Sequence, residues 1–137
     1  MYNILLLSHG SLAEEFKETL GLFMSNNDYV YAIGLKDKGI EKFNHEVCDV
    51  VKKIYDEDKG ILILTDLYGG SPFNMAINKI KPQYRNVEVL AGLNLPMLVE
   101  ARLMEGNTLK ETVDSIIENK QNYISMFEVL EANEDDE

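Results

Sequence analysis

Cysteine is nearly absent from this sequence: Cys48 is the one cysteine among 137 residues. A single thiol cannot form a disulfide bond within the chain, so the fold has to rest on a hydrophobic core. A chain of this length can bury such a core in one domain. The cysteine usage therefore favours a reducing, cytoplasmic setting over an oxidising, extracellular one.

Long hydrophobic runs are also missing. The first apolar run, at residues 4–7, has no Lys or Arg before it and stops at a serine and a histidine. A secretory signal needs a basic start and a longer apolar stretch, and a membrane helix needs about 20 apolar residues. We therefore expect no signal peptide and no direct insertion into a membrane.

Basic residues are scarce, since 13 Lys and Arg face 24 Asp and Glu, for a net charge of −11. Nucleic-acid binding needs a basic surface, so this balance argues against it. An acidic surface instead favours fast encounter with a basic protein partner. The acids cluster at the end of the chain, and we expect one domain over residues 1–130 followed by a disordered acidic tail over 131–137.

Short apolar runs alternate with helical patterns. The runs are rich in Leu, Ile and Val and lie at residues 4–7, 29–33, 61–64 and 87–91. Between them, apolar side chains recur at the helical spacing of three and four residues. The two clearest stripes are Leu12, Phe16, Leu20 and Phe23, and Ile40, Phe43, Val47, Val51 and Ile54. This alternation predicts a doubly wound α/β fold with a mainly parallel central sheet of four strands and helices on both faces.

Several helix starts are marked by capping residues or by proline, both of which favour the first turn of a helix. The starts are indicated by Ser11 with Glu14, Ser71 with Pro72, Pro96, and Thr108 with Glu111. The first two should follow directly on predicted strands. Residues 123–130 fit either a helix or a strand.

Polar side chains stand where predicted strands end: His9 closes the first, Asp66 the third, and Asn94 follows the fourth. The carboxyl ends of parallel strands share one edge of the sheet, where ligands bind. The helix N-termini at that edge suit a phosphoryl group. A neutral imidazole can act as a nucleophile and carry phosphate when a carboxylate fixes its tautomer, and Asp66 is the acid placed to do so.

Small residues beside these side chains can supply hydrogen-bond donors to a phosphate. A tight turn at Gly69 and Gly70 can expose backbone N–H groups, and the Ser71 hydroxyl can add another donor. Gly10 and Ser11 stand in the equivalent place after His9. Taken singly, each of these residues also fits a turn or a packing role; their joint placement favours a site.

Three blocks of the sequence resemble the enzyme IIA domain of the mannose family of the bacterial phosphoenolpyruvate-dependent sugar phosphotransferase system. They are Leu-Leu-Leu-Ser-His-Gly at 5–10, Leu-Thr-Asp-Leu-Tyr-Gly-Gly-Ser-Pro-Phe-Asn at 64–74, and Ala-Gly-Leu-Asn-Leu-Pro-Met-Leu-Val-Glu at 91–100. The second block is the most specific. The similarity extends over roughly residues 1–125.

The resemblance implies that His9 accepts a phosphoryl group from the phosphohistidine of the carrier protein HPr and passes it to a histidine of a IIB component. It implies that Asp66 holds Nδ1 of the ring and leaves Nε2 to be phosphorylated. Transfer between two imidazoles relies on positioning and charge stabilisation, so we expect no metal and no organic cofactor. The candidate residues for docking these partners are Leu67, Tyr68, Phe73, Asn94 and Met97.

The resemblance also implies an assembly. Members of the family form homodimers, some with a C-terminal strand exchanged between subunits, and residues 123–130 are the candidate for such an extra strand. Because the chain ends in the acidic tail, we expect IIB to be a separate protein. The chain would act on the membrane subunits IIC and IID only indirectly. Because those subunits set the specificity, this sequence does not indicate which sugar is transported.

Two alternatives remain. Small metal chelatases of tetrapyrrole synthesis also have His-Gly-Ser after a first strand, but they need further inward-facing ligands. The second histidine here, His45, lies about 160° from the apolar stripe of its predicted helix, so we expect it on the surface. A IIA-like regulatory sensor would keep His9 and Asp66 and differ only in its downstream partner.

Overall fold

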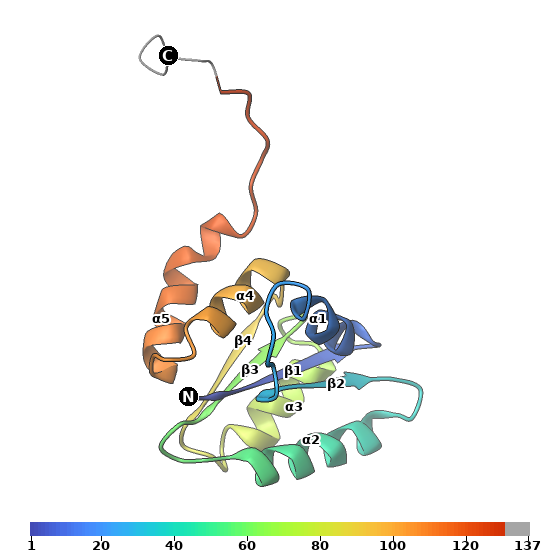
Figure 1. Cartoon of the computed structure of the whole chain (residues 1–137). Helices are drawn as coiled ribbons and strands as arrows, with labels where there is room; N and C mark the ends of the chain where they lie inside the picture. Colours follow the sequence, from blue (N-terminus) through green and yellow to red (C-terminus); the bar gives the residue numbers. More distant parts are fainter. Residues whose placement is uncertain (131–137) are drawn as a thin grey trace.

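The computed structural model describes residues 1–130. Its sheet contains β1 (Asn3–His9), β2 (Val30–Leu35), β3 (Ile61–Thr65) and β4 (Val87–Ala91). All neighbouring pairs are parallel, and the strand order is β2-β1-β3-β4. The chain thus moves to one side from β1 and to the other side from β3, which confirms the predicted doubly wound, parallel sheet (Figure 1).

Helices cover both faces of this sheet, as the sequence predicted (Figure 1). One face packs against α1 (Leu12–Leu20), α4 (Leu95–Leu103) and α5 (Leu109–Asn119). The other packs against α2 (Ile40–Ile54), α3 (Ser71–Met75) and the π-helical turn η1 (Ala76–Ile80) that continues α3. A short 3₁₀ turn, η2 (Lys120–Asn122), follows α5.

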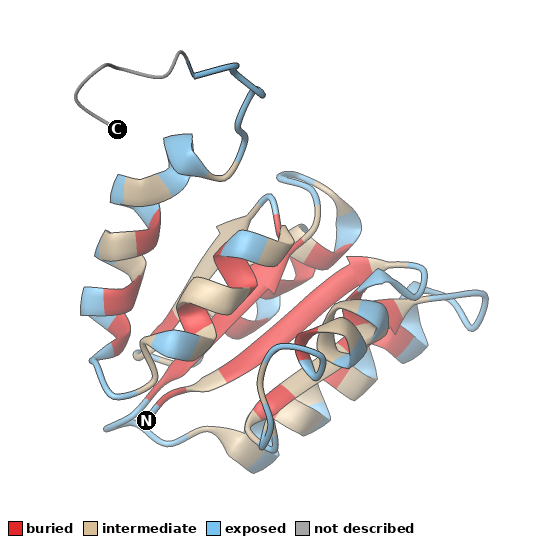
Figure 2. Ribbon diagram, turned by 45° about the horizontal axis from the view of Figure 1, so that its top comes forward, coloured by how far each residue is buried: buried red, intermediate tan, exposed pale blue. Residues whose placement is uncertain are grey.

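The apolar runs form strands because both of their faces are buried. In β1, Ile4 and Leu6 belong to the core on the α1 side, whereas Leu5 and Leu7 belong to the core on the α2 side. All four side chains are fully buried. Figure 2 shows the two central strands, β1 and β3, buried along most of their length, the edge strand β4 mostly intermediate, and the helices buried on one side only. The sheet is therefore the shared centre of two hydrophobic layers.

The start of α1 differs from the sequence prediction. Ser11 makes no capping hydrogen bond; instead the hydroxyl of Ser8, fully buried in β1, accepts one from the Ala13 N–H at 2.8 Å. The predicted box of Ser11 with Glu14 is wrong because Gly10, at φ +58°, turns the chain so that Ala13 lies against the strand it has just left.

The end of α1 and the start of α3 also differ from prediction. The α1 stripe stops at Leu20; Leu12 and Phe23, expected in the core, are 51% and 61% exposed. Gly70, rather than Ser71, occupies the capping position of α3, and Ser71 makes no capping bond. The proline in the first turn of α3 is confirmed.

The later helix starts follow the predictions. The Asn94 side chain caps α4 by accepting from the Met97 N–H at 2.9 Å, one residue before the helix that holds Pro96. Thr108 and Glu111 form both bonds of a capping box at the start of α5, each 3.1 Å long. At both of these helix starts, the residue that the sequence indicated lies at the cap or in the first turn.

The C-terminal segment, residues 124–130, adopts neither helix nor strand and leaves the body of the molecule (Figure 1). Its apolar side chains are 81–90% exposed: Ile124, Met126, Phe127, Val129 and Leu130. The acidic tail expected at 131–137 lies outside the described residues. Within residues 1–130, none of the helices has the length and hydropathy of a membrane span.

Candidate functional site

The carboxyl ends of β1 and β3 form the point where the sheet changes winding direction. His9 is the last residue of β1, and Asp66 directly follows β3, the strand that pairs with β1. In open α/β sheets, loops leaving two neighbouring strands in opposite directions open a crevice for ligands at this point. The structure thus brings together two predicted site residues that are 57 positions apart in the sequence.

The side chains of His9 and Asp66 are bonded to each other. Nδ1 of the His9 ring lies 2.9 Å from Oδ2 of Asp66, and the backbone N–H of His9 donates to the same oxygen at 2.9 Å. The other carboxylate oxygen, Oδ1, accepts from the Leu67 N–H at 2.9 Å. The carboxylate is therefore fixed by both strands' ends, and the imidazole is fixed by the carboxylate.

The surroundings of Asp66 keep it ionised. Its side chain is 10% exposed, and this burial alone would raise its pKa. The hydrogen bonds from the His9 backbone and ring, the charge of His9 and the Leu67 N–H outweigh the burial, so the pKa of Asp66 lies below its usual range. An ionised carboxylate only accepts hydrogen bonds, so in the neutral ring Nδ1 carries the proton and Nε2 keeps a free lone pair.

The His9 side chain is 43% exposed, so a large reactant can reach it. Gly10 follows in the left-handed conformation, and its N–H donates to the Leu35 carbonyl at 2.8 Å. Gly34 in β2 makes this turn possible, because a Cβ there would overlap the Gly10 carbonyl oxygen. Sequence reasoning missed Gly34, although a lone glycine inside an apolar strand is a signal of close backbone approach.

The loop after Asp66 forms the other wall of the site. Gly69 has φ +81°, and the Gly70 N–H closes a turn onto the Leu67 carbonyl at 3.1 Å. The Asn74 side chain braces the loop by donating to the Gly69 carbonyl at 3.0 Å. Ser71 is exposed at the first residue of α3.

Exposed apolar side chains lie beside Asp66, on the loop that forms the apolar border of the site. Leu67 and Tyr68 are 61% and 83% exposed, and the Tyr68 ring packs on the Phe73 ring with centroids 4.4 Å apart. These side chains border a cavity of about 690 Å³ that extends along β4 to α5 and Tyr123. Asn94 and Met97 also line it; Asn94 is engaged in capping α4, and Met97 is a core residue, 4% exposed.

The remaining candidate ligands lie elsewhere. His45 is on α2, 79% exposed, with Nε2 3.5 Å from a carboxylate oxygen of Asp49, which confirms the expected surface position. Cys48 is a free thiol, partly buried against the core on the α2 side. Among residues 1–130, no three His, Cys, Asp or Glu side chains are grouped so that they could hold a metal ion.

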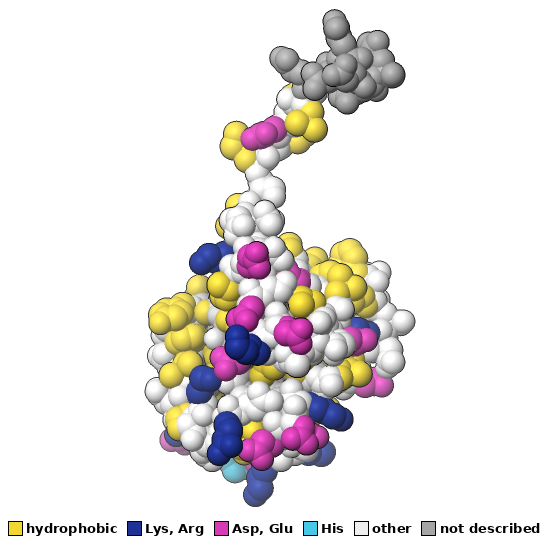
Figure 3. Space-filling model, turned by 90° about the vertical axis from the view of Figure 1, so that its left-hand side faces the viewer, with side chains coloured by type: hydrophobic (Ala, Val, Ile, Leu, Met, Phe, Trp, Pro, Cys, Tyr) yellow, Lys and Arg dark blue, Asp and Glu magenta, His cyan; other side chains and the backbone are white. Residues whose placement is uncertain are grey.

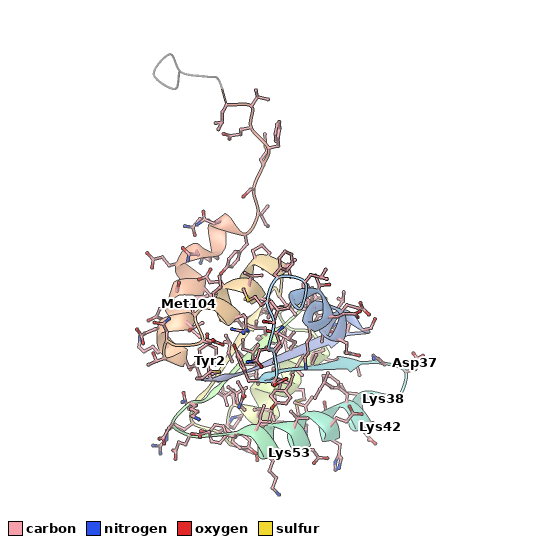
Figure 4. All side chains as sticks on the ribbon, in the orientation of Figure 1. Tyr2, Asp37, Lys38, Lys42, Lys53 and Met104 are labelled. Atoms are coloured by element: carbon pink, nitrogen blue, oxygen red, sulfur yellow. The ribbon has the colours of Figure 1, made fainter. Side chains whose placement is uncertain are left out.

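Charges on the molecule are mixed rather than segregated. Figure 3 shows Asp and Glu interspersed with Lys and Arg on one face, with hydrophobic side chains gathered toward its edges. Figure 4 shows Lys42 and Lys53 of α2 pointing away from the sheet. These faces are ordinary solvated surfaces, in contrast to the apolar border of the His9 edge.

Comparisons with known proteins place this geometry in a family. The sequence profile of the EIIA-man family, PTS system fructose IIA component, matches residues 3–121. The PTS system fructose-specific EIIA component of Bacillus subtilis is 29% identical over 118 residues, which cover 85% of this chain and 80% of that protein. The PTS system mannose-specific EIIAB component of Escherichia coli is 35% identical over 102 residues, or 71% of this chain, but the match spans only 30% of that longer protein.

A solved structure agrees with these sequence comparisons. The PTS IIA protein associated with the fucose utilization operon of Streptococcus pneumoniae superposes with a TM-score of 0.78 at 31% identity, covering 91% of this chain and 93% of that one. The match over nearly all of the sheet and helices, together with the profile, shows the family. The chain therefore belongs to the mannose family of IIA components of the sugar phosphotransferase system.

Proposed function

We propose that this chain is the phosphoryl carrier of its phosphotransferase system, with His9 as the residue that is phosphorylated. The single observation that carries this proposal is the 2.9 Å bond between His9 Nδ1 and Asp66 Oδ2. It leaves Nε2 as the one ring nitrogen with a free lone pair, on a side chain that a partner protein can reach. Family membership supplies the reaction class.

The proposed reaction is a reversible exchange of one N–P bond for another. Nε2 of His9 attacks the phosphorus of the phosphohistidine of HPr; its N–P bond breaks as the new Nε2–P bond forms. The proton on Nδ1 stays in place, and the Asp66 carboxylate stabilises the positive charge that the ring gains. In the second step a IIB histidine attacks the same phosphorus, and His9 returns to its neutral form.

The transferring phosphoryl group needs donors for its oxygen atoms. Of the predicted phosphate contacts, the Gly10 N–H already donates to the Leu35 carbonyl, and the Gly70 N–H to the Leu67 carbonyl. Ser11 and Ser71 stand at the starts of α1 and α3, where backbone N–H groups lack acceptors within the helix. We therefore assign phosphate binding to the N–H and hydroxyl groups of Ser11 and Ser71, with Gly69 shaping the turn.

Docking of HPr and IIB would use the apolar border of His9. Leu67, Tyr68 and Phe73 were expected there, and Leu12, exposed at the first residue of α1, adds a fourth apolar side chain. Exposed aromatic side chains are common anchors of protein interfaces. A dry contact also excludes water from the phosphoryl group, so the protein acts as a relay and not as a phosphatase.

The assembly we propose is a homodimer that serves a separate IIB and, through it, the membrane subunits IIC and IID, in the cytoplasm. The apolar segment 124–130 is exposed, and the neighbouring edge strand β4 has one side without a partner strand within residues 1–130. Exchange of this segment between two copies would cover both. Analytical sedimentation tests this proposal. The native chain should sediment as a dimer and the variant F127D/V129D as a monomer. If the native chain also sediments as a monomer, the exchange is excluded.

The phosphoryl carrier role is tested by incubating the protein with phosphoenolpyruvate, enzyme I and HPr, followed by intact mass measurement at neutral or alkaline pH, since phosphohistidine is acid-labile. The native protein and the matched control His45→Ala should each gain one phosphoryl group, whereas His9→Ala should gain none. If the native protein gains none while HPr is phosphorylated, the proposed function is wrong. Onward transfer to an added IIB separates transport from a sensor role.

A further inference from the structure

The imidazole ring of His9 is confined along two edges. Nδ1 is held by Asp66 Oδ2 at 2.9 Å. The adjoining edge, Cε1 and Nε2, faces the backbone of Gly70: a Cβ atom on Gly70 would lie 2.8 Å from Cε1 and 3.5 Å from Nε2. Non-bonded carbon atoms pack best at about 3.5–4.0 Å, so a methyl group and the ring cannot both occupy this space.

Backbone conformation does not explain the glycine at this position. Gly70 has φ −73° and ψ 169°, an extended conformation that every amino acid adopts. Its neighbour Gly69 is the opposite case, with φ +81° and nothing within 4 Å of a Cβ. Of the two adjacent glycines, Gly69 allows the left-handed backbone of the turn, and Gly70 leaves the space that the ring occupies.

Gly70 also cannot withdraw from the ring. Its N–H donates to the Leu67 carbonyl at 3.1 Å, and its carbonyl accepts from the Asn74 N–H at 2.8 Å. A Cβ would in addition lie 3.3 Å from the Leu67 carbonyl oxygen. The ring, by contrast, is 43% exposed and can move toward solvent. A side chain at Gly70 would therefore displace His9 rather than the loop.

We propose that Gly70 is a positioning residue of the relay: its missing side chain leaves the space in which the His9 ring stays bonded to Asp66 with Nε2 facing the partner. This inference rests on the proposed function for its consequence, but not for its geometry. A ring pushed off Asp66 loses the group that keeps the proton on Nδ1. It then presents either nitrogen to the phosphoryl donor.

The test is ¹⁵N NMR of the imidazole nitrogens in the unphosphorylated protein, comparing native protein, Gly70→Ala and Gly106→Ala. Gly106 is a matched control, because a Cβ there meets nothing within 4 Å. The native protein and Gly106→Ala should show His9 with its proton on Nδ1. Gly70→Ala should show a mixture of the two tautomers, and native-like ring shifts in a folded Gly70→Ala would overturn the proposal.

Phosphoryl transfer from HPr gives the functional readout. A displacement of about 1 Å can slow a positioned reaction about 100-fold, so we expect a loss of that order in Gly70→Ala and none in Gly106→Ala. If the native protein is not phosphorylated at all, the proposed function is wrong, but the tautomer measurement still tests whether Gly70 positions the ring. If Gly70→Ala does not fold, the nuclear Overhauser effect between His9 Hε1 and the Gly70 Hα protons of the native protein decides: its absence overturns the proposal.

Discussion

One carboxylate oxygen, Asp66 Oδ2, accepts hydrogen bonds from both the backbone N–H and the ring Nδ1 of His9. A single residue thus fixes the end of β1 and the orientation of the ring together. Sequence reasoning identified this pair because both residues end apolar runs. It did not show that Gly34 makes room for the Gly10 turn or that Gly70 makes room for the ring, since those contacts join separate parts of the chain.

Replacing Asp66 by asparagine tests the carboxylate itself. The amide keeps the size of the side chain but removes the charge proposed to stabilise the phosphorylated ring, so we expect phosphoryl transfer from HPr to slow by at least about 100-fold. Rapid-quench measurement of phospho-His9 formation would give the rate. Transfer at the native rate in Asp66→Asn would show that the charge has no role.

At the scale of elements, helix α1 is joined to the strand before it by a side chain of that strand. The buried hydroxyl of Ser8 accepts from the Ala13 N–H at 2.8 Å, where the sequence had indicated Ser11. The sequence pattern of Ser11 and Glu14 is a local one. It failed because the left-handed Gly10 brings the helix back over β1, a contact that no spacing rule encodes.

Substitution of the two serines separates these alternatives. Ser8→Ala leaves the buried Ala13 N–H without an acceptor, so the free energy of unfolding should fall by about 1–2 kcal/mol. Ser11→Ala, at an exposed position without a capping bond, should change it by less than about 0.5 kcal/mol. Urea unfolding of both variants measures this. A larger loss in Ser11→Ala would contradict the assignment of the cap.

Across the whole molecule, Tyr2 connects the first residues to the last helices. Its hydroxyl donates to the Ala101 carbonyl of α4 at 2.6 Å and accepts from the Thr112 hydroxyl of α5 at 2.9 Å. Figure 4 shows Tyr2 at the start of β1, under these helices. The sequence predicted the strands and both helical layers from periodicity, but not this tyrosine, because its partners lie about a hundred positions away.

The buried hydroxyl of Tyr2 makes the stability of the fold depend on pH in the alkaline range. Burial raises the pKa of Tyr2 to about 12, an effect that the Thr112 hydrogen bond opposes and the charges of Glu105 and Glu100 reinforce. A pKa raised by folding contributes stability that is complete below pH 10 and is lost as the pH rises toward 12. Denaturant unfolding at pH 8 to 11.5 should show a steeper loss in the native protein than in Tyr2→Phe. Equal slopes would contradict this role.

The strand order predicts where the molecule opens locally. His9 and Asp66 lie at the ends of the two central strands, whereas β2 and β4 form the edges. Local opening begins at edges and loops, and central strands separate only when the whole domain unfolds. We therefore expect His9, the proposed phosphoryl acceptor, to lie on the part of the chain with the highest protection against hydrogen exchange, and the loop proposed to contact its partners to fluctuate without disturbing it.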